Sequence, residues 1–188
     1  HADKEDVQGL QPAVDHDWYI VKKDDTRHIT TYAKNEEGKS IRSFKIEARI
    51  DASLATLAGV HFDVANIKKW YWETLESKLL SKVSDTEYIY YMKFNTPLAP
   101  DRDVVIRATI EPFQDSHKYM LLRLRGEPSI MPVPDGVTRL TAFDIDIKLT
   151  PLVNGETQMD VQGYIDPSGG LPAWTVNMFQ RQAPYATM

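Results

Sequence analysis

Most of the chain follows a strand period of two, and a long helical pattern comes only at its end. Short turns or proline-containing loops separate nine runs with this period, which are 18–23, 26–34, 40–50, 74–84, 86–95, 102–113, 117–126, 138–149 and 156–165. A short helical pattern follows the third run, where Asp51 or Ser53 can cap the first turn. Strands that do not alternate with helices predict an antiparallel sheet and an α+β fold. Between the last two runs, Asn154-Gly155 is typical of a tight hairpin.

One face of this sheet is expected to be dry. Apolar side chains recur at alternate positions of the central runs with polar ones between them, which is typical of an antiparallel sheet with one wet face. The residues that we assign to the dry face are Tyr88, Tyr90, Met92, Phe94, Val104, Ile106, Ala108, Met120, Leu122, Phe143 and Ile145.

The helical pattern over 171–188 is the only long helix available to cover that face. Pro172 suits its first turn, and Leu171, Trp174 and Met178 share one side. Helix and sheet either fill one core together or, where the sheet curves widely, leave an apolar cavity. Ligand pockets of that kind typically measure ~300–1,000 Å³. The periodicity fits both arrangements.

Length and composition indicate one domain and argue against several kinds of site and partner. The 188 residues suit one domain, with an irregular polar extension over 1–16. The absence of cysteine excludes disulfides and thiolate metal sites. A net charge of −5 without a basic face predicts no nucleic-acid partner. The five histidines lack metal-ligand spacing and no cofactor-binding fingerprint occurs, so we expect neither a metal nor a cofactor.

Four stretches of the chain resemble a known family in their order and spacing. They contain Phe62-Asp63-Val64 with Trp70, then Ser84 to Tyr91 leading through Pro97 to Asp101-Arg102-Asp103-Val104-Val105, then Pro132 with Val137-Thr138-Arg139, and finally Tyr164 to Trp174 with Asn177. Together they resemble the START (StAR-related lipid-transfer) domains, of the bacterial type, in the helix-grip (Bet v 1-like) superfamily.

The resemblance implies one START-like domain over 1–188, with a curved antiparallel sheet of about nine strands wrapped around the C-terminal helix. It implies a monomer that holds a lipid or other hydrophobic molecule in an apolar cavity, and that contacts membranes transiently. The dry-face residues, Trp174 and Met178 would line that cavity. Sterol-binding members carry an acid and an arginine where this chain has Met92 and Ala108. The resemblance therefore favours a more uniformly apolar ligand here.

Three alternatives bear on function and compartment. Related helix-grip folds include polyketide cyclases and aromatases, for which Tyr88, Tyr90 and His61 would be the polar candidates, although the resemblance favours a carrier without catalytic residues. The second alternative function is a ligand-gated interaction module without a transfer role. His1-Ala2-Asp3 fits either a signal-peptide cut, and so a periplasmic or secreted protein, or a cloning remnant, for which we expect a cytoplasmic protein. We expect Arg102 to be structural, within an ion pair that ties a loop to a strand start.

Overall fold

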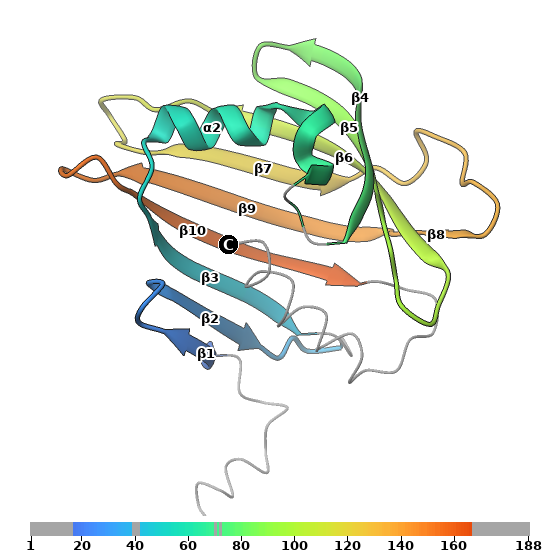
Figure 1. Cartoon of the computed structure of the whole chain (residues 1–188), viewed down its shortest axis with the longest axis horizontal. Helices are drawn as coiled ribbons and strands as arrows, with labels where there is room; N and C mark the ends of the chain where they lie inside the picture. Colours follow the sequence, from blue (N-terminus) through green and yellow to red (C-terminus); the bar gives the residue numbers. More distant parts are fainter. Residues whose placement is uncertain (1–16, 39–41, 70, 72, 167–188) are drawn as a thin grey trace, which may run out of the picture.

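The computed structural model describes residues 17–38, 42–69, 71 and 73–166 of the chain, and most of them belong to one sheet (Figure 1). The elements are β1 (Tyr19–Asp24), β2 (Ile29–Lys34), β3 (Ser43–Ile50), α2 (Leu54–Phe62), the 3-10 helix η2 (Val64–Lys69), β4 (Thr74–Ser84), β5 (Glu87–Phe94), β6 (Asp101–Glu111), β7 (Met120–Gly126), β8 (Val137–Arg139), β9 (Ala142–Pro151) and β10 (Thr157–Asp166). Nine strands follow the order β1-β2-β3-β10-β9-β7-β6-β5-β4, and β8 pairs with β6 beside this path. Within the described residues, no helix is long and apolar enough to cross a membrane.

The two helical elements among the described residues define the inner face of the sheet, against which they pack. Ser53 caps α2, because its side chain accepts a hydrogen bond from the Thr56 N–H. The helix contacts β9, and η2 lies along β4 (Figure 1). Val64 and Ile67 of η2 join the main hydrophobic core, which gathers on this face. The opposite surface is called the outer face below.

Two glycines permit a close approach of strands in the middle of the sheet. A Cβ atom on Gly163 of β10 would lie 2.6 Å from the carbonyl oxygen of Asp144 on β9. On Gly126 of β7 it would lie 3.3 Å from the Cβ of Phe143. A side chain at residue 163 would therefore push β9 away, so glycine is required at this close approach.

The edge strand β4 contains three bulges where it pairs with β5. Its register with β5 shifts three times, and the residue left without a partner at each shift is Leu75, Leu80 or Val83. These residues are 47%, 37% and 51% exposed, respectively. Bulges interrupt the row of backbone groups that an edge offers to another strand, so this edge is a poor template for strand addition.

The predicted fold class is confirmed, with one strand corrected. Nine strands form the main path, the pairs along it are antiparallel, and Asn154-Gly155 joins β9 to β10 with Gly155 at a φ of 85°. The run 138–149, however, is not one strand. It divides into β8, which runs parallel to β6, and β9, because Leu140 turns into the core and its N–H donates to the Asp103 carbonyl at 2.8 Å. The predicted helix over 171–188 lies outside the described residues.

Candidate functional site

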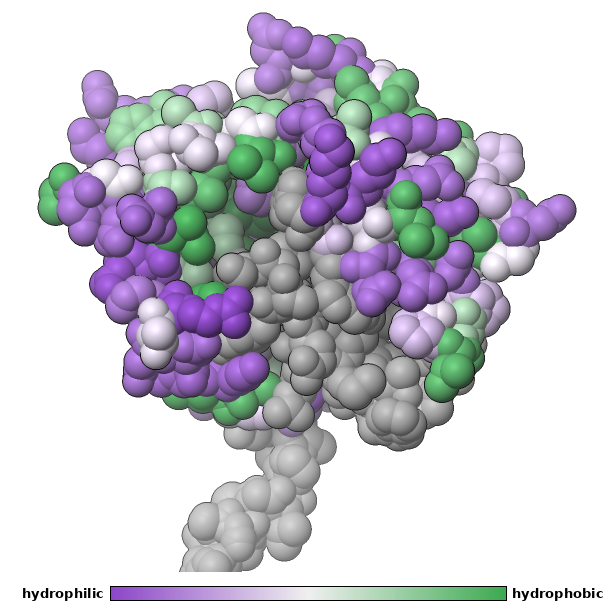
Figure 2. Space-filling view, in the orientation of Figure 1, coloured by the Kyte–Doolittle hydropathy of each residue, from purple (hydrophilic) through white to green (hydrophobic). Residues whose placement is uncertain are grey.

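The inner face of the central strands is apolar, as the alternation predicts. Tyr90 pairs with Ile106 across β5 and β6, and Met92 pairs with Val104. Ten of the eleven residues that we assigned to the dry face are buried in the main core, and Met120 packs against it half-buried. Figure 2 shows green hydrophobic side chains set back below the position of α2. Trp174 and Met178, the remaining residues of that prediction, lie outside the described part of the chain.

A small cavity lies on the inner face at the end of β5 where the loop 95–100 begins. Its volume is about 30 Å³, enough for one water, and its lining residues are Tyr71, Phe94, Thr96, Arg102, Leu140, Phe143 and Ile165. Arg102 stands opposite Phe94 and is 3% exposed, and its guanidinium donates to the Pro100 carbonyl. Burial lowers the pKa of Arg102. A cation therefore belongs to the inner face, where the sequence predicted only apolar side chains.

Two tyrosines at the other end of β5 carry polar groups into the apolar face. The rings of Tyr88 and Tyr90 stack with centroids 5.6 Å apart, and Phe62 at the end of α2 meets Tyr88 edge-on at 6.2 Å. Burial raises the pKa of Tyr88 to about 12 and that of Tyr90 well above its usual value. Neither hydroxyl has a hydrogen-bond partner among the described residues.

His61 belongs to the same end of the inner face. Its Nδ1 lies 2.9 Å from the carbonyl oxygen of Leu57, and because a carbonyl only accepts, Nδ1 is the protonated nitrogen. Burial lowers the pKa of His61 and so favours the neutral ring. This hydrogen bond gives the ring a structural role, since it closes the last turn of α2.

The outer face of β5 and β6 contains a buried charged network instead. The Tyr91 hydroxyl donates to Asp103 Oδ2 at 2.8 Å, and Arg139 holds both oxygens of the same carboxylate at 2.6 and 3.0 Å. The Asp103 side chain is 0% exposed and that of Arg139 is 5% exposed. Burial and then the bond to Asp103 raise the pKa of Tyr91.

Arg139 also fixes the loop that covers this network. Its guanidinium donates to the carbonyl oxygens of Pro128, Met131 and Pro132 at 2.9, 2.6 and 3.3 Å. Under the loop 127–136, Ile89 and Val105 pack with Tyr91 in a second small core that Met131 touches. The prediction of a uniformly wet outer face is therefore wrong here, because a loop covers it. The buried ion pair at the start of β6 joins Asp103 to β8, not to its neighbour Arg102.

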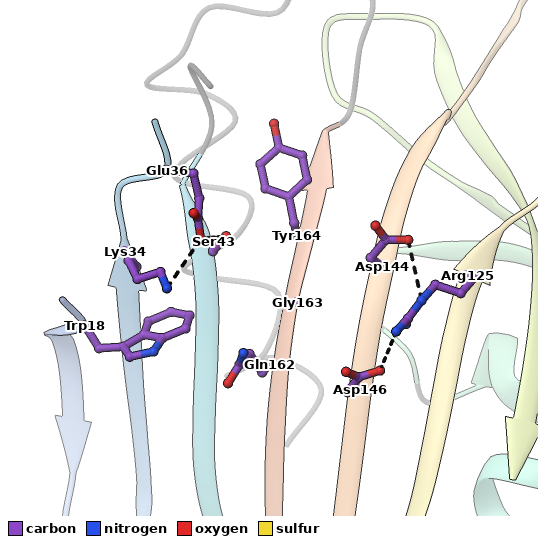
Figure 3. Close-up of a pocket in the computed structure, with 10 residues that line it drawn as sticks. All are labelled: Trp18, Lys34, Glu36, Ser43, Arg125, Asp144, Asp146, Gln162, Gly163 and Tyr164. Atoms are coloured by element: carbon purple, nitrogen blue, oxygen red, sulfur yellow. Dashed lines mark hydrogen bonds and ion pairs between the residues drawn. The ribbon is translucent and has the colours of Figure 1, made fainter. Parts of the chain in front are cut away.

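A polar hollow of about 190 Å³ lies elsewhere on the outer face (Figure 3). Its lining residues are Trp18, Lys34, Glu36, Ser43, Arg125, Asp144, Asp146, Gln162, Gly163 and Tyr164. Its charged side chains pair with one another, Lys34 with Glu36 at 3.8 Å and Arg125 with Asp146 at 2.9 Å. Such a lining suits water better than a lipid. No group of His, Asp and Glu within the described residues is placed to hold a metal ion.

Comparison with known proteins decides which fold family this sheet represents. The family model of the START domain matches residues 5–183. The chain belongs to the START domain family. An uncharacterized protein of Pseudomonas aeruginosa, PA1579, is 29% identical to this START domain over 177 residues, which is 94% of the chain and 85% of that protein.

Solved structures agree with this assignment. A STAR-related lipid transfer protein fragment from Xanthomonas axonopodis superimposes with a TM-score of 0.81 at 26% identity, covering 90% of this START domain and 93% of that chain. The lipid transfer and protein localization domain of human StarD13 has a TM-score of 0.81 at 15% identity, with coverage of 100% and 93%. The Zhui aromatase/cyclase from Streptomyces sp. R1128 shares the fold more loosely, with a TM-score of 0.54 at 11% identity and coverage of 77% and 87%.

Sequence reasoning missed two parts of the site in this START domain. Arg102 has the same parity on β6 as Val104 and Ile106, so extending the alternation by one step would have placed it on the inner face. The contact between Asp103 and Arg139 had no comparable signal, because 36 residues separate the two.

Proposed function

We propose that this START domain binds a lipid or another hydrophobic small molecule in an internal apolar cavity on its inner face. The apolar surface of that face carries the proposal, since it continues across β5, β6, β7, β9 and β10. The proposed lining is Tyr88, Tyr90, Met92, Phe94, Val104, Ile106, Ala108, Met120, Leu122, Phe143, Ile145, Trp174 and Met178. The name of the Xanthomonas axonopodis structure, a lipid transfer protein, supports the same class of ligand.

The chemistry of this face favours an apolar body for the ligand. Met92 and Ala108 lie on it without a charged neighbour in register, since they stand opposite Val104 and Tyr88. Burying an ionised group in such surroundings is costly unless it is paired and hydrogen-bonded. A ligand whose buried part is mostly hydrocarbon would meet no such cost.

Native mass spectrometry of the purified protein tests the proposal. We expect a co-purifying molecule that organic solvent extracts, and we expect the variant Met92→Glu to lose it. The control is Met92→Leu, which keeps the volume and polarity of the side chain. Retention of the same molecule by Met92→Glu at wild-type occupancy would contradict the proposed position of the cavity.

Transfer between membranes is the finer part of the proposal. Donor vesicles that contain a self-quenched fluorescent phospholipid, mixed with unlabelled acceptor vesicles, would report it as protein-dependent dequenching. A protein that binds lipid but does not accelerate exchange would be a sensor or a store instead of a carrier.

An enzyme of the cyclase type is the second candidate. It is favoured by the neutral, buried His61 and by the two tyrosine hydroxyls at the same end of the inner face. General acid–base catalysis needs such groups within reach of the substrate. Conversion of a poly-β-ketone substrate by wild-type protein, abolished in His61→Gln, would replace the carrier by this enzyme.

A further inference from the structure

Tyr88 and Tyr90 differ from the other residues assigned to the cavity, because each brings a hydroxyl into an apolar environment. They are 9% and 5% exposed. Neither hydroxyl oxygen is among the fully buried side-chain atoms of the described residues that lack a partner, so each keeps contact with open space, and a phenylalanine would fill nearly the same volume without presenting a polar group there. Neither hydroxyl has a partner among the described residues.

The same strand shows how the protein treats a tyrosine that serves the fold alone. Tyr91, next to Tyr90 but on the outer face, donates to Asp103 at 2.8 Å. Its hydroxyl is therefore satisfied by the protein itself. The two inner hydroxyls keep their protons at neutral pH, as an ordinary tyrosine does, and burial raises the pKa of both further.

We propose that Tyr88 and Tyr90 form a hydrogen-bond-donating subsite for an acceptor oxygen of the bound ligand. The inference rests on the proposed function, and it adds that the ligand is not a plain hydrocarbon. The oxygen is a carbonyl, ester or carboxyl oxygen, placed at the end of the inner face where Phe62 of α2 meets Tyr88.

Arg102 lies far along the inner face from the proposed subsite. Arg102 stands opposite Phe94, whereas Tyr88 stands opposite Ala108 six positions further along β6. That separation corresponds to roughly 20 Å of strand for Tyr88, and the four positions between Arg102 and Ile106, which stands opposite Tyr90, correspond to roughly 13 Å. The donors of the two tyrosines therefore act far from the buried guanidinium, and an oxygen bound by them needs no negative charge.

Three tritiated probes of one chain length test the subsite by equilibrium dialysis: hexadecane, methyl palmitate and palmitic acid. We expect Tyr88→Phe and Tyr90→Phe each to weaken binding of methyl palmitate by about five-fold, as the loss of one neutral hydrogen bond does. The double variant should lose more, and hexadecane should bind all variants equally. If the variants lose more affinity for palmitic acid than for methyl palmitate, the subsite binds a carboxylate. If they lose equal affinity for both, the subsite binds a neutral carbonyl.

Tyr91→Phe is the matched control, because it makes the same substitution one residue away on the opposite face. It should lower stability and leave the preference among the three probes unchanged. Equal weakening of all three probes in Tyr88→Phe and Tyr90→Phe, or no weakening at all, would overturn the subsite while the carrier remains. Failure of every probe to bind the wild-type protein would overturn the proposed function itself.

Discussion

Tyr90 and Tyr91 are neighbours on β5, yet they lie in opposite kinds of environment. Tyr91 is buried on the outer face within a network of full charges, where its hydroxyl donates to Asp103 and Arg139 pairs with the same carboxylate. Tyr90 is buried on the inner face among apolar side chains, and no described residue satisfies it. Polar groups that hold the fold are thus paired within the protein, whereas polar groups that we assign to the ligand are left available.

Removing the charge that balances Asp103 should have the largest effect. In Arg139→Met the carboxylate stays buried without its cation, and loss of one partner of a buried pair typically costs ~3–5 kcal/mol. Urea unfolding measures this as a lower midpoint. The control is Arg123→Met, which breaks the half-exposed pair with Glu111 and should cost at most about 1 kcal/mol. Similar losses in the two variants would show that the network does not hold the fold.

Tyr91→Phe should destabilise the protein by a smaller amount. The substitution keeps the ring but leaves one oxygen of Asp103 with one donor fewer, which costs ~1–3 kcal/mol for a buried group. The difference in unfolding free energy at neutral pH measures it. A variant as stable as the wild type would mean that Arg139 alone satisfies the carboxylate.

The stability of the protein should fall at alkaline pH because the inner tyrosines are buried. A pKa raised in the folded state means that the unfolded chain loses its proton first, so the stabilisation is complete below pH 10 and is lost as pH rises toward the folded value. For Tyr88, whose pKa rises from 10.0 to about 12, the loss at pH 11 is about 1 kcal/mol. Urea midpoints of the wild type and Tyr88→Phe at pH 9 and 11 should show a shallower decline in the variant. Parallel declines would place the hydroxyl in water.

Tyr90→Phe should have the smallest effect on the ligand-free protein. No described residue bonds its hydroxyl, so removing that oxygen should change the unfolding free energy by less than about 0.5 kcal/mol, or raise it. A loss as large as that in Tyr91→Phe would reveal a partner within the protein and would remove the contrast between the two faces.

The sequence was sufficient to predict the sheet and its inner face, because both depend on local patterns. Alternation places Tyr90, Met92 and Val104 on one side, and Asn154-Gly155 fixes the last hairpin. The break at Leu140 left a local signal that the prediction missed, since the polar residues Arg139 and Thr141 stand at the alternate positions that Phe143 continues, whereas Leu140 stands on the opposite side. The covered patch around Tyr91 depends on the fold of the loop 127–136 and on a contact across 36 residues, which periodicity does not encode.

The pairing of β3 with β10 has a consequence for how the chain folds. Ile50 meets Thr157 and Phe44 meets Gly163, so the free edge of the first three strands is closed by the last strand of the described sheet. During synthesis, β1 to β3 emerge early but keep an open edge until the ribosome has added more than a hundred further residues. Contacts so distant along the chain slow folding, and an unpaired edge invites association with other chains. The step that joins the two halves of the sheet is therefore also the step at which a nascent chain is most exposed to aggregation.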